Sequence, residues 1–160
     1  MSQTLSTSEI LKKLFQEYNL IFDKTDPKSK DNDIFVHNHF TIIKRSGIEK
    51  IQKAANIHIR YEPILVTENA VFLKGVGTSY NEDGSIKDIV ETFSSASDRT
   101  STSAYYAEMA EKRAMSRIVL KLAGLYEFGV FGADESDEWK DEAKRIQQQS
   151  PTKKAVYKGE

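Results

Sequence analysis

The sequence contains no cysteine among its 160 residues, so disulfide frameworks, thiolate zinc sites and cysteine nucleophiles are excluded. It also lacks an excess of charge of either sign, because 23 lysines and arginines face 24 aspartates and glutamates. No apolar run approaches the roughly 20 residues that span a bilayer, and the first residues lack the ordered regions of a signal peptide. We therefore expect a cytoplasmic protein without a membrane partner.

A length of 160 residues allows one hydrophobic core, and 39% hydrophobic residues are enough to fill it. The composition changes after residue 133. Residues 134–142 hold six acidic residues and one lysine, and the sequence beyond them is polar without apolar periodicity. We expect a single α+β domain over residues 1–133. Residues 134–160 are expected to form an acidic segment and, from about residue 143, a disordered tail.

Capping signals and apolar periodicity predict two helices in the first third of the chain. Ser6 with Glu9 and Ser46 with Glu49 have the spacing of capping boxes. The predicted elements are a short N-terminal helix over about 8–19, a solvated loop over 23–33, a strand over 34–43 and a helix over about 47–55.

The middle of the chain predicts an antiparallel β-meander followed by a long helix, a β-β-β-α core. Alternating apolar residues and the turn signal Asp83-Gly84 favour strands over 57–63, 69–80 and 85–93. A serine- and threonine-rich segment over 94–103 then suggests a flexible connection. The periodic segment 104–124, with Gly124 as its C-terminal cap, predicts a helix packed across the sheet. Gly75 and Gly77 favour close packing of a strand over a phosphate-binding loop.

The long helix carries four cations. Arg113, Arg117 and Lys121 follow one another at intervals of four residues, and Lys112 lies beside them. Cations that repeat once per helical turn suit a polyanionic backbone. An ordinary solvated helix face has the same pattern, so the charges alone leave both interpretations open.

The order of elements resembles that of the single-strand annealing proteins of the Rad-fifty-two-like superfamily, which includes the phage Erf and Sak families. The similarity rests on FTIIKRSGIEKIQKAANIHIRYEPI, VFLKGVGTSYNEDGSIKDIVETFSSAS and AEMAEKRAMSRIVLKLAG, within residues 40–124. The resemblance implies a homo-oligomeric ring or filament whose basic groove holds single-stranded DNA without a cofactor. By position it implies DNA contacts from Lys112, Arg113 and Arg117, although Arg117 departs by one residue from the usual spacing.

We expect a non-enzymatic single-stranded DNA-binding protein that promotes annealing or recombination, encoded by a phage or mobile element and active in the cytoplasm of a bacterial host. The expected DNA-binding residues are Lys112, Arg113, Arg117, Lys121 and, chosen on charge and location, Lys44, Arg45 and Arg60. The acidic segment suggests competition with DNA or a replication or nuclease partner. Alternatives are a protein that protects single strands without annealing them, and an adaptor that binds no nucleic acid.

His37 and His39 would share one face of the predicted strand, since side chains of a strand alternate with a period of two. A metal-dependent nuclease would need further ligands beside them, and the sequence offers only His58 and scattered carboxylates. We therefore expect no metal, no cofactor and no catalytic residues.

Overall fold

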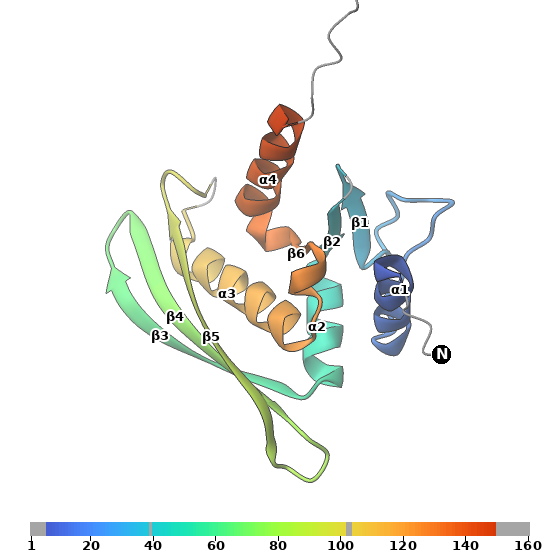
Figure 1. Cartoon of the computed structure of the whole chain (residues 1–160). Helices are drawn as coiled ribbons and strands as arrows, with labels where there is room; N and C mark the ends of the chain where they lie inside the picture. Colours follow the sequence, from blue (N-terminus) through green and yellow to red (C-terminus); the bar gives the residue numbers. More distant parts are fainter. Residues whose placement is uncertain (1–5, 39, 102–103, 150–160) are drawn as a thin grey trace, which may run out of the picture.

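The computed structural model describes residues 6–38, 40–101 and 104–149. The described chain combines helices with two β-sheets, which confirms the expected α+β class (Figure 1). Its elements are α1 (Thr7–Glu17), β1 (Ile34–His37), β2 (Phe40–Ile43), α2 (Arg45–Ala54), β3 (Ile57–Val66), β4 (Ala70–Tyr80), β5 (Ile86–Ser97), α3 (Tyr106–Leu122), the 3-10 turn η1 (Tyr126–Phe128), β6 (Val130–Gly132), the 3-10 turn η2 (Ala133–Glu135) and α4 (Ser136–Gln149).

The larger sheet is the predicted antiparallel meander, with strand order β3-β4-β5. The Asp83-Gly84 signal lies in the β4–β5 turn, where Gly84 has a φ of 84°. The segment 94–103 is not wholly a flexible connection, because β5 continues to Ser97. Ser94 is buried and its hydroxyl donates a hydrogen bond to the carbonyl of Ala110 in α3. Small residues extend the strand here because α3 packs closely against it.

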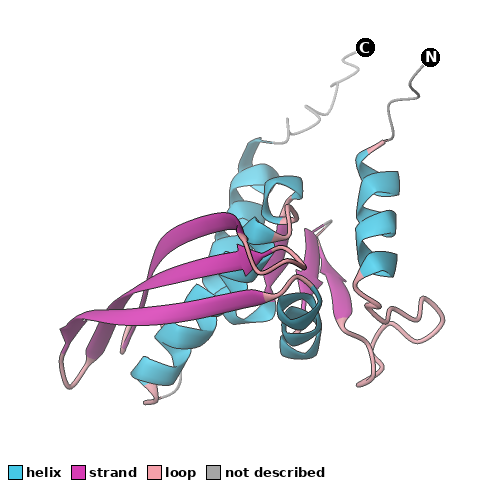
Figure 2. Ribbon diagram, turned by 90° about the horizontal axis from the view of Figure 1, so that it is seen from below, coloured by secondary structure: helices cyan, strands magenta, loops and turns pink. Residues whose placement is uncertain are grey.

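Helix α3 lies across one face of the large sheet, as expected, and no described helix covers the other face (Figures 1 and 2). The glycines of β4 permit this approach: a Cβ atom on Gly77 would lie 2.1 Å from Cγ2 of Ile118. The helix ends in a Schellman motif, in which Gly124 has a φ of 72° and the amide of Leu125 donates to the carbonyl of Leu120 at 2.9 Å. The predicted C-terminal cap is therefore confirmed.

A second, smaller sheet has the order β1-β2-β6, with β6 parallel to β2. The predicted single strand over 34–43 is instead a tight hairpin, because Asn38 adopts a left-handed conformation with a φ of 45°. His39 lies outside the described residues, so its position relative to His37 is not tested. Within the described residues, no group of three or more histidine, aspartate or glutamate side chains is arranged to hold a metal ion.

The two predicted capping boxes have different outcomes. At α1, Ser6 and Glu9 form both reciprocal hydrogen bonds, so the prediction is confirmed. At α2 the prediction is wrong, because the helix begins at Arg45 and its N-cap residue forms no side-chain hydrogen bond. The hydroxyl of Ser46 instead donates to Asp33 Oδ1 at 2.6 Å. Ser46 therefore binds a buried carboxylate of the preceding loop and not an amide of its own helix.

The expectation of disorder from residue 143 is wrong for residues 143–149, which belong to α4. These seven residues, AKRIQQQ, include Ala, Lys, Arg and Gln, which have high helix propensity. The rest of the expected tail, residues 150–160, lies outside the described residues. Among the described helices, none is both long and apolar enough to cross a membrane.

Candidate nucleic-acid interface

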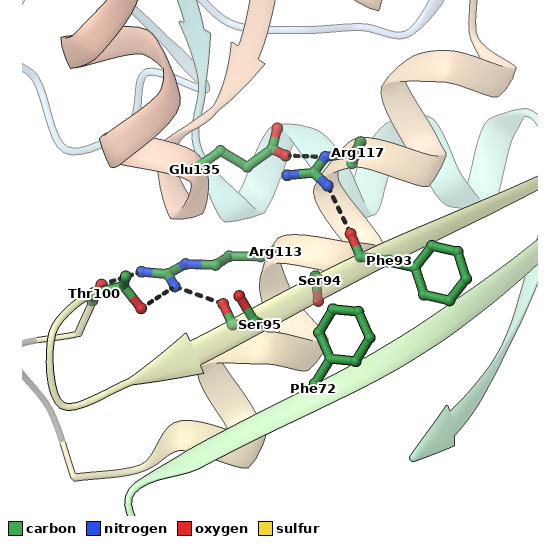
Figure 3. A pocket seen from close by; sticks show the side chains of 8 residues that line it. All are labelled: Phe72, Phe93, Ser94, Ser95, Thr100, Arg113, Arg117 and Glu135. Carbon is green, nitrogen blue, oxygen red and sulfur yellow. Dashed lines mark hydrogen bonds and ion pairs between the residues drawn. The ribbon is translucent and has the colours of Figure 1, made fainter. Parts of the chain in front are cut away.

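Two arginines of α3 reach the edge of the large sheet at β5 (Figure 3). Arg113 Nη1 donates to the carbonyl of Ser95 at 2.8 Å, and Arg117 Nη1 donates to the carbonyl of Phe93 at 2.7 Å. Arg113 and Arg117 are four residues apart, which is about 6 Å along a helix. Their two acceptors are two residues apart, which is about 6.8 Å along a strand, so the two spacings nearly match. The arginine pair therefore covers two successive outward-facing carbonyl groups of an edge strand.

The same arginines hold the segment that follows β6. Arg117 Nε forms an ion pair with Oε1 of Glu135 at 2.7 Å, and the Glu135 side chain is only 1% exposed. Arg113 Nε donates to the carbonyl of Asp134 at 3.3 Å, and its Nη2 donates to the carbonyl of Thr100. The two guanidinium groups thus connect α3 to β5, to the turn at Thr100 and to η2.

These contacts show that the solvated-face interpretation is wrong for Arg113 and Arg117, whereas binding of a polyanionic backbone stays a prediction. Arg113 is 9% exposed, and the side chain of Arg117 is 18% exposed, so neither lies on a solvated helix face. Lys112 and Lys121 are exposed, and they flank the buried part of the helix from different sides. The physical reason is that α3 packs between the large sheet on one side and α2, β6 and η2 on the other.

A pocket of about 320 Å³ lies at this edge. Its lining combines two aromatic rings with hydroxyl groups and the two arginines: Phe72, Phe93, Ser94, Ser95, Thr100, Arg113, Arg117 and Glu135. The rings of Phe72 and Phe93 are nearly parallel, with centroids 5.7 Å apart and planes inclined by 3° (Figure 3). Phe72 is 37% exposed and Phe93 is 51% exposed. Two parallel, partly exposed aromatic rings therefore lie beside two cations.

The other predicted cations do not join this pocket. Lys44 donates to the carbonyl of Ser29 at 3.2 Å, and Arg45 pairs with Glu49 at 3.0 Å, both near the start of α2. Lys121 lies over the ring of Tyr126, with 5.3 Å between its Nζ and the ring centroid.

Arg60 projects from the uncovered face of the large sheet, where it pairs with Glu62 at 3.1 Å. Phe72 and Phe93 share this face, since the inner side of β4 and β5 is marked by buried residues such as Leu73 and Thr92. Lys74 stands opposite Phe93 in the register and pairs with Glu91 at 3.2 Å. The uncovered face therefore carries two phenylalanines and two cations.

Sequence reasoning missed Phe93 and Lys74. The signal that could have identified Phe93 is the alternation of side chains between the two faces of β5. Phe93 lies between Thr92 and Ser94, which are buried on the opposite face. Tyr61 lies on the face that α3 covers. Its burial raises the pKa of its hydroxyl to about 12.

No family model, curated protein or solved structure matches the chain.

Proposed function

We propose that this protein binds single-stranded DNA at the β5 edge and on the adjoining uncovered face of the large sheet, and that it promotes annealing of complementary strands. The observation that carries the proposal is the exposed parallel pair of Phe72 and Phe93 in one pocket with Arg113 and Arg117. Proteins that bind single strands without sequence preference combine aromatic stacking surfaces with a cationic path for the backbone.

The aromatic pair supplies the stacking part of this site. Every base has a π-face, and its stacking on an aromatic side chain contributes about 1–3 kcal/mol. Phe72 and Phe93 come from neighbouring strands, which fixes their spacing without help from a partner. A duplex hides its base faces, so the same surface favours single strands.

The polar groups around the rings supply the backbone part. Ser95 and Thr100 place exposed hydroxyl-bearing residues at the pocket. Lys74 and Arg60 continue the cationic path across the sheet, and their carboxylate partners are exposed by 57% and 41%. Surface ion pairs of this kind contribute little stability, so a phosphate group can replace either carboxylate at small cost.

The test is the affinity of the full chain for a fluorescein-labelled oligothymidylate, measured by fluorescence anisotropy at about 50 mM and 200 mM salt. Phe72→Ala with Phe93→Ala should weaken binding roughly tenfold to a hundredfold, because stacking on both rings is lost. The matched control, Ile21→Ala with Val36→Ala, removes exposed apolar side chains that lie outside the large sheet and do not line the pocket, and it should leave the affinity within about twofold.

Charge is tested separately. Arg60→Gln with Lys74→Gln should reduce the dependence of affinity on salt. With two fewer cations on the protein, fewer counterions are released from DNA on binding. Equal binding of duplex and single strand, or an unchanged affinity after loss of both phenylalanines, would contradict the proposal. Faster pairing of two labelled complementary strands would distinguish annealing from protection alone.

A further inference from the structure

A second pocket lies between α1 and the small sheet, away from the residues of the proposed DNA site. Its volume is about 460 Å³, within the roughly 300–1,000 Å³ typical of ligand sites. The lining comes from α1, from the segment that follows it and from the first two strands: Ser8, Leu11, Lys12, Phe15, Gln16, Leu20, Phe22, Lys24, Ile34 and Thr41. We call these ten residues the α1 groove.

The floor of the α1 groove is apolar and incompletely covered. Leu11 and Phe15 face it from α1, which has an apolar stripe but no fully buried residue. Val36, opposite Thr41 in the register, continues the sheet face and is 59% exposed. Helix α1 forms its own N-terminal cap and packs its apolar stripe against the main core, but Leu11 and Phe15 remain only partly buried.

The charged residues that line the α1 groove all have one sign. Lys12 and Lys24 reach it from different segments, and its lining contains no aspartate or glutamate. Both lysines are exposed, and neither has an ion-pair partner among the described residues. An apolar floor between two unpaired cations is complementary to a chain that carries large apolar side chains beside carboxylates.

We infer that the α1 groove binds an acidic peptide segment of a partner protein, with one or two large apolar side chains on the floor and carboxylates at Lys12 and Lys24. Helical or extended segments bind grooves in this way, with apolar anchors for affinity and rim charges for orientation. The inference is independent of DNA binding, since no residue of the α1 groove lines the pocket at β5.

The probe is a fluorescein-labelled peptide, Asp-Asp-Leu-Leu-Phe, titrated with the full chain and followed by fluorescence anisotropy. Lys12→Glu with Lys24→Glu should weaken binding roughly tenfold or more, because attraction at both lysines becomes repulsion. The matched control, Lys13→Glu with Lys28→Glu, makes the same change in net charge at exposed lysines outside the groove. It should change the affinity by less than about twofold. A Lys-Lys-Leu-Leu-Phe peptide should bind more weakly than the acidic one.

Three results would overturn the inference: no binding at concentrations up to about 1 mM, equal weakening by the two lysine pairs, or equal affinity for the acidic and basic peptides. Binding that appears only after removal of residues 1–5 would also overturn it, because the chain's own N-terminus would then be the occupant. All four substitutions are at exposed positions, so each variant is expected to keep the fold.

Discussion

The guanidinium group of Arg113 joins three parts of the chain that are distant in sequence. It donates to backbone carbonyl groups at the end of β5, in the turn at Thr100 and in η2. A hydrogen bond from a charged donor contributes about 1.5–3 kcal/mol, and the loss of Arg113 removes this donor from three backbone carbonyl groups. Arg113 is therefore a stabilising residue of the fold as well as part of the proposed site.

We predict that Arg113→Ala lowers the free energy of unfolding by about 2–4 kcal/mol in urea denaturation. Lys112→Ala is the matched control, because Lys112 is the adjacent, exposed cation of the same helix. Its loss should change the free energy of unfolding by less than about 0.5 kcal/mol. Equal destabilisation by the two substitutions would show that the contacts of Arg113 with β5 and η2 contribute nothing specific.

Asp33 makes the stability depend on pH. Burial alone would raise the pKa of its carboxyl group, but hydrogen bonds from Lys50, Ser46 and the amide of Ile21 outweigh burial and lower that pKa. The folded-state pKa therefore lies below the unfolded value of about 3.9. The carboxylate contributes stability that is fully present above about pH 4 and is lost as the pH falls through the folded-state pKa.

Asp33→Asn should accordingly cost about 2–3 kcal/mol of unfolding free energy at pH 7 and less near pH 3. Urea denaturation at a series of pH values measures both quantities. Asp31→Asn serves as the control, since Asp31 is exposed and lies in the same loop. A constant difference between Asp33→Asn and the parent chain from pH 7 to pH 3 would exclude this role for the carboxylate.

At the scale of elements, the two edges of the large sheet are protected by different means. Unpaired strand edges attract other chains, so proteins cover them or interrupt them. Arginines cover part of the β5 edge. At the β3 edge, the carbonyl of Asn56 accepts a hydrogen bond from the amide of Tyr80 in β4. Backbone groups of a strand point alternately toward and away from the neighbouring strand, so even-numbered residues of β3 face β4 and Pro63 faces away from it. Proline has no amide hydrogen to offer there, and a register shift follows it.

Pro63→Thr should restore an outward-facing amide donor and increase concentration-dependent self-association, measured by static light scattering. Pro27→Thr is the control, because Pro27 is an exposed proline in a loop. If neither substitution changes the scattering, Pro63 does not protect the edge. The β3 edge would then stay a candidate interface for the homo-oligomer that the resemblance implies.

At the scale of the whole molecule, local signals predicted the elements well and their long-range partners poorly. The capping box of α1, the Asp83-Gly84 turn and the stop at Gly124 were predicted because each depends on a few adjacent residues. Strand β6 was missed because it has three residues and pairs with a strand about 90 residues earlier.

The candidate site was predictable only in part for the same reason. A helical wheel places Arg113 and Arg117 on one flank of α3, but it does not reveal that β5 and η2 cover that flank. The paired phenylalanines became apparent only once the register of β4 with β5 was known. Composition predicted neither the covered arginines nor the paired phenylalanines, since a net charge of −1 does not show where individual residues lie.

The parallel pairing of β2 with β6 also sets a limit on the order of folding during synthesis. Residues 57–97 can form their meander as soon as they leave the ribosome, because each strand pairs with its neighbour in sequence. The small sheet must wait for residues 130–132. Until translation has passed them, the β1–β2 hairpin has an unpaired edge, and a nascent chain stalled before this point would present that edge to chaperones.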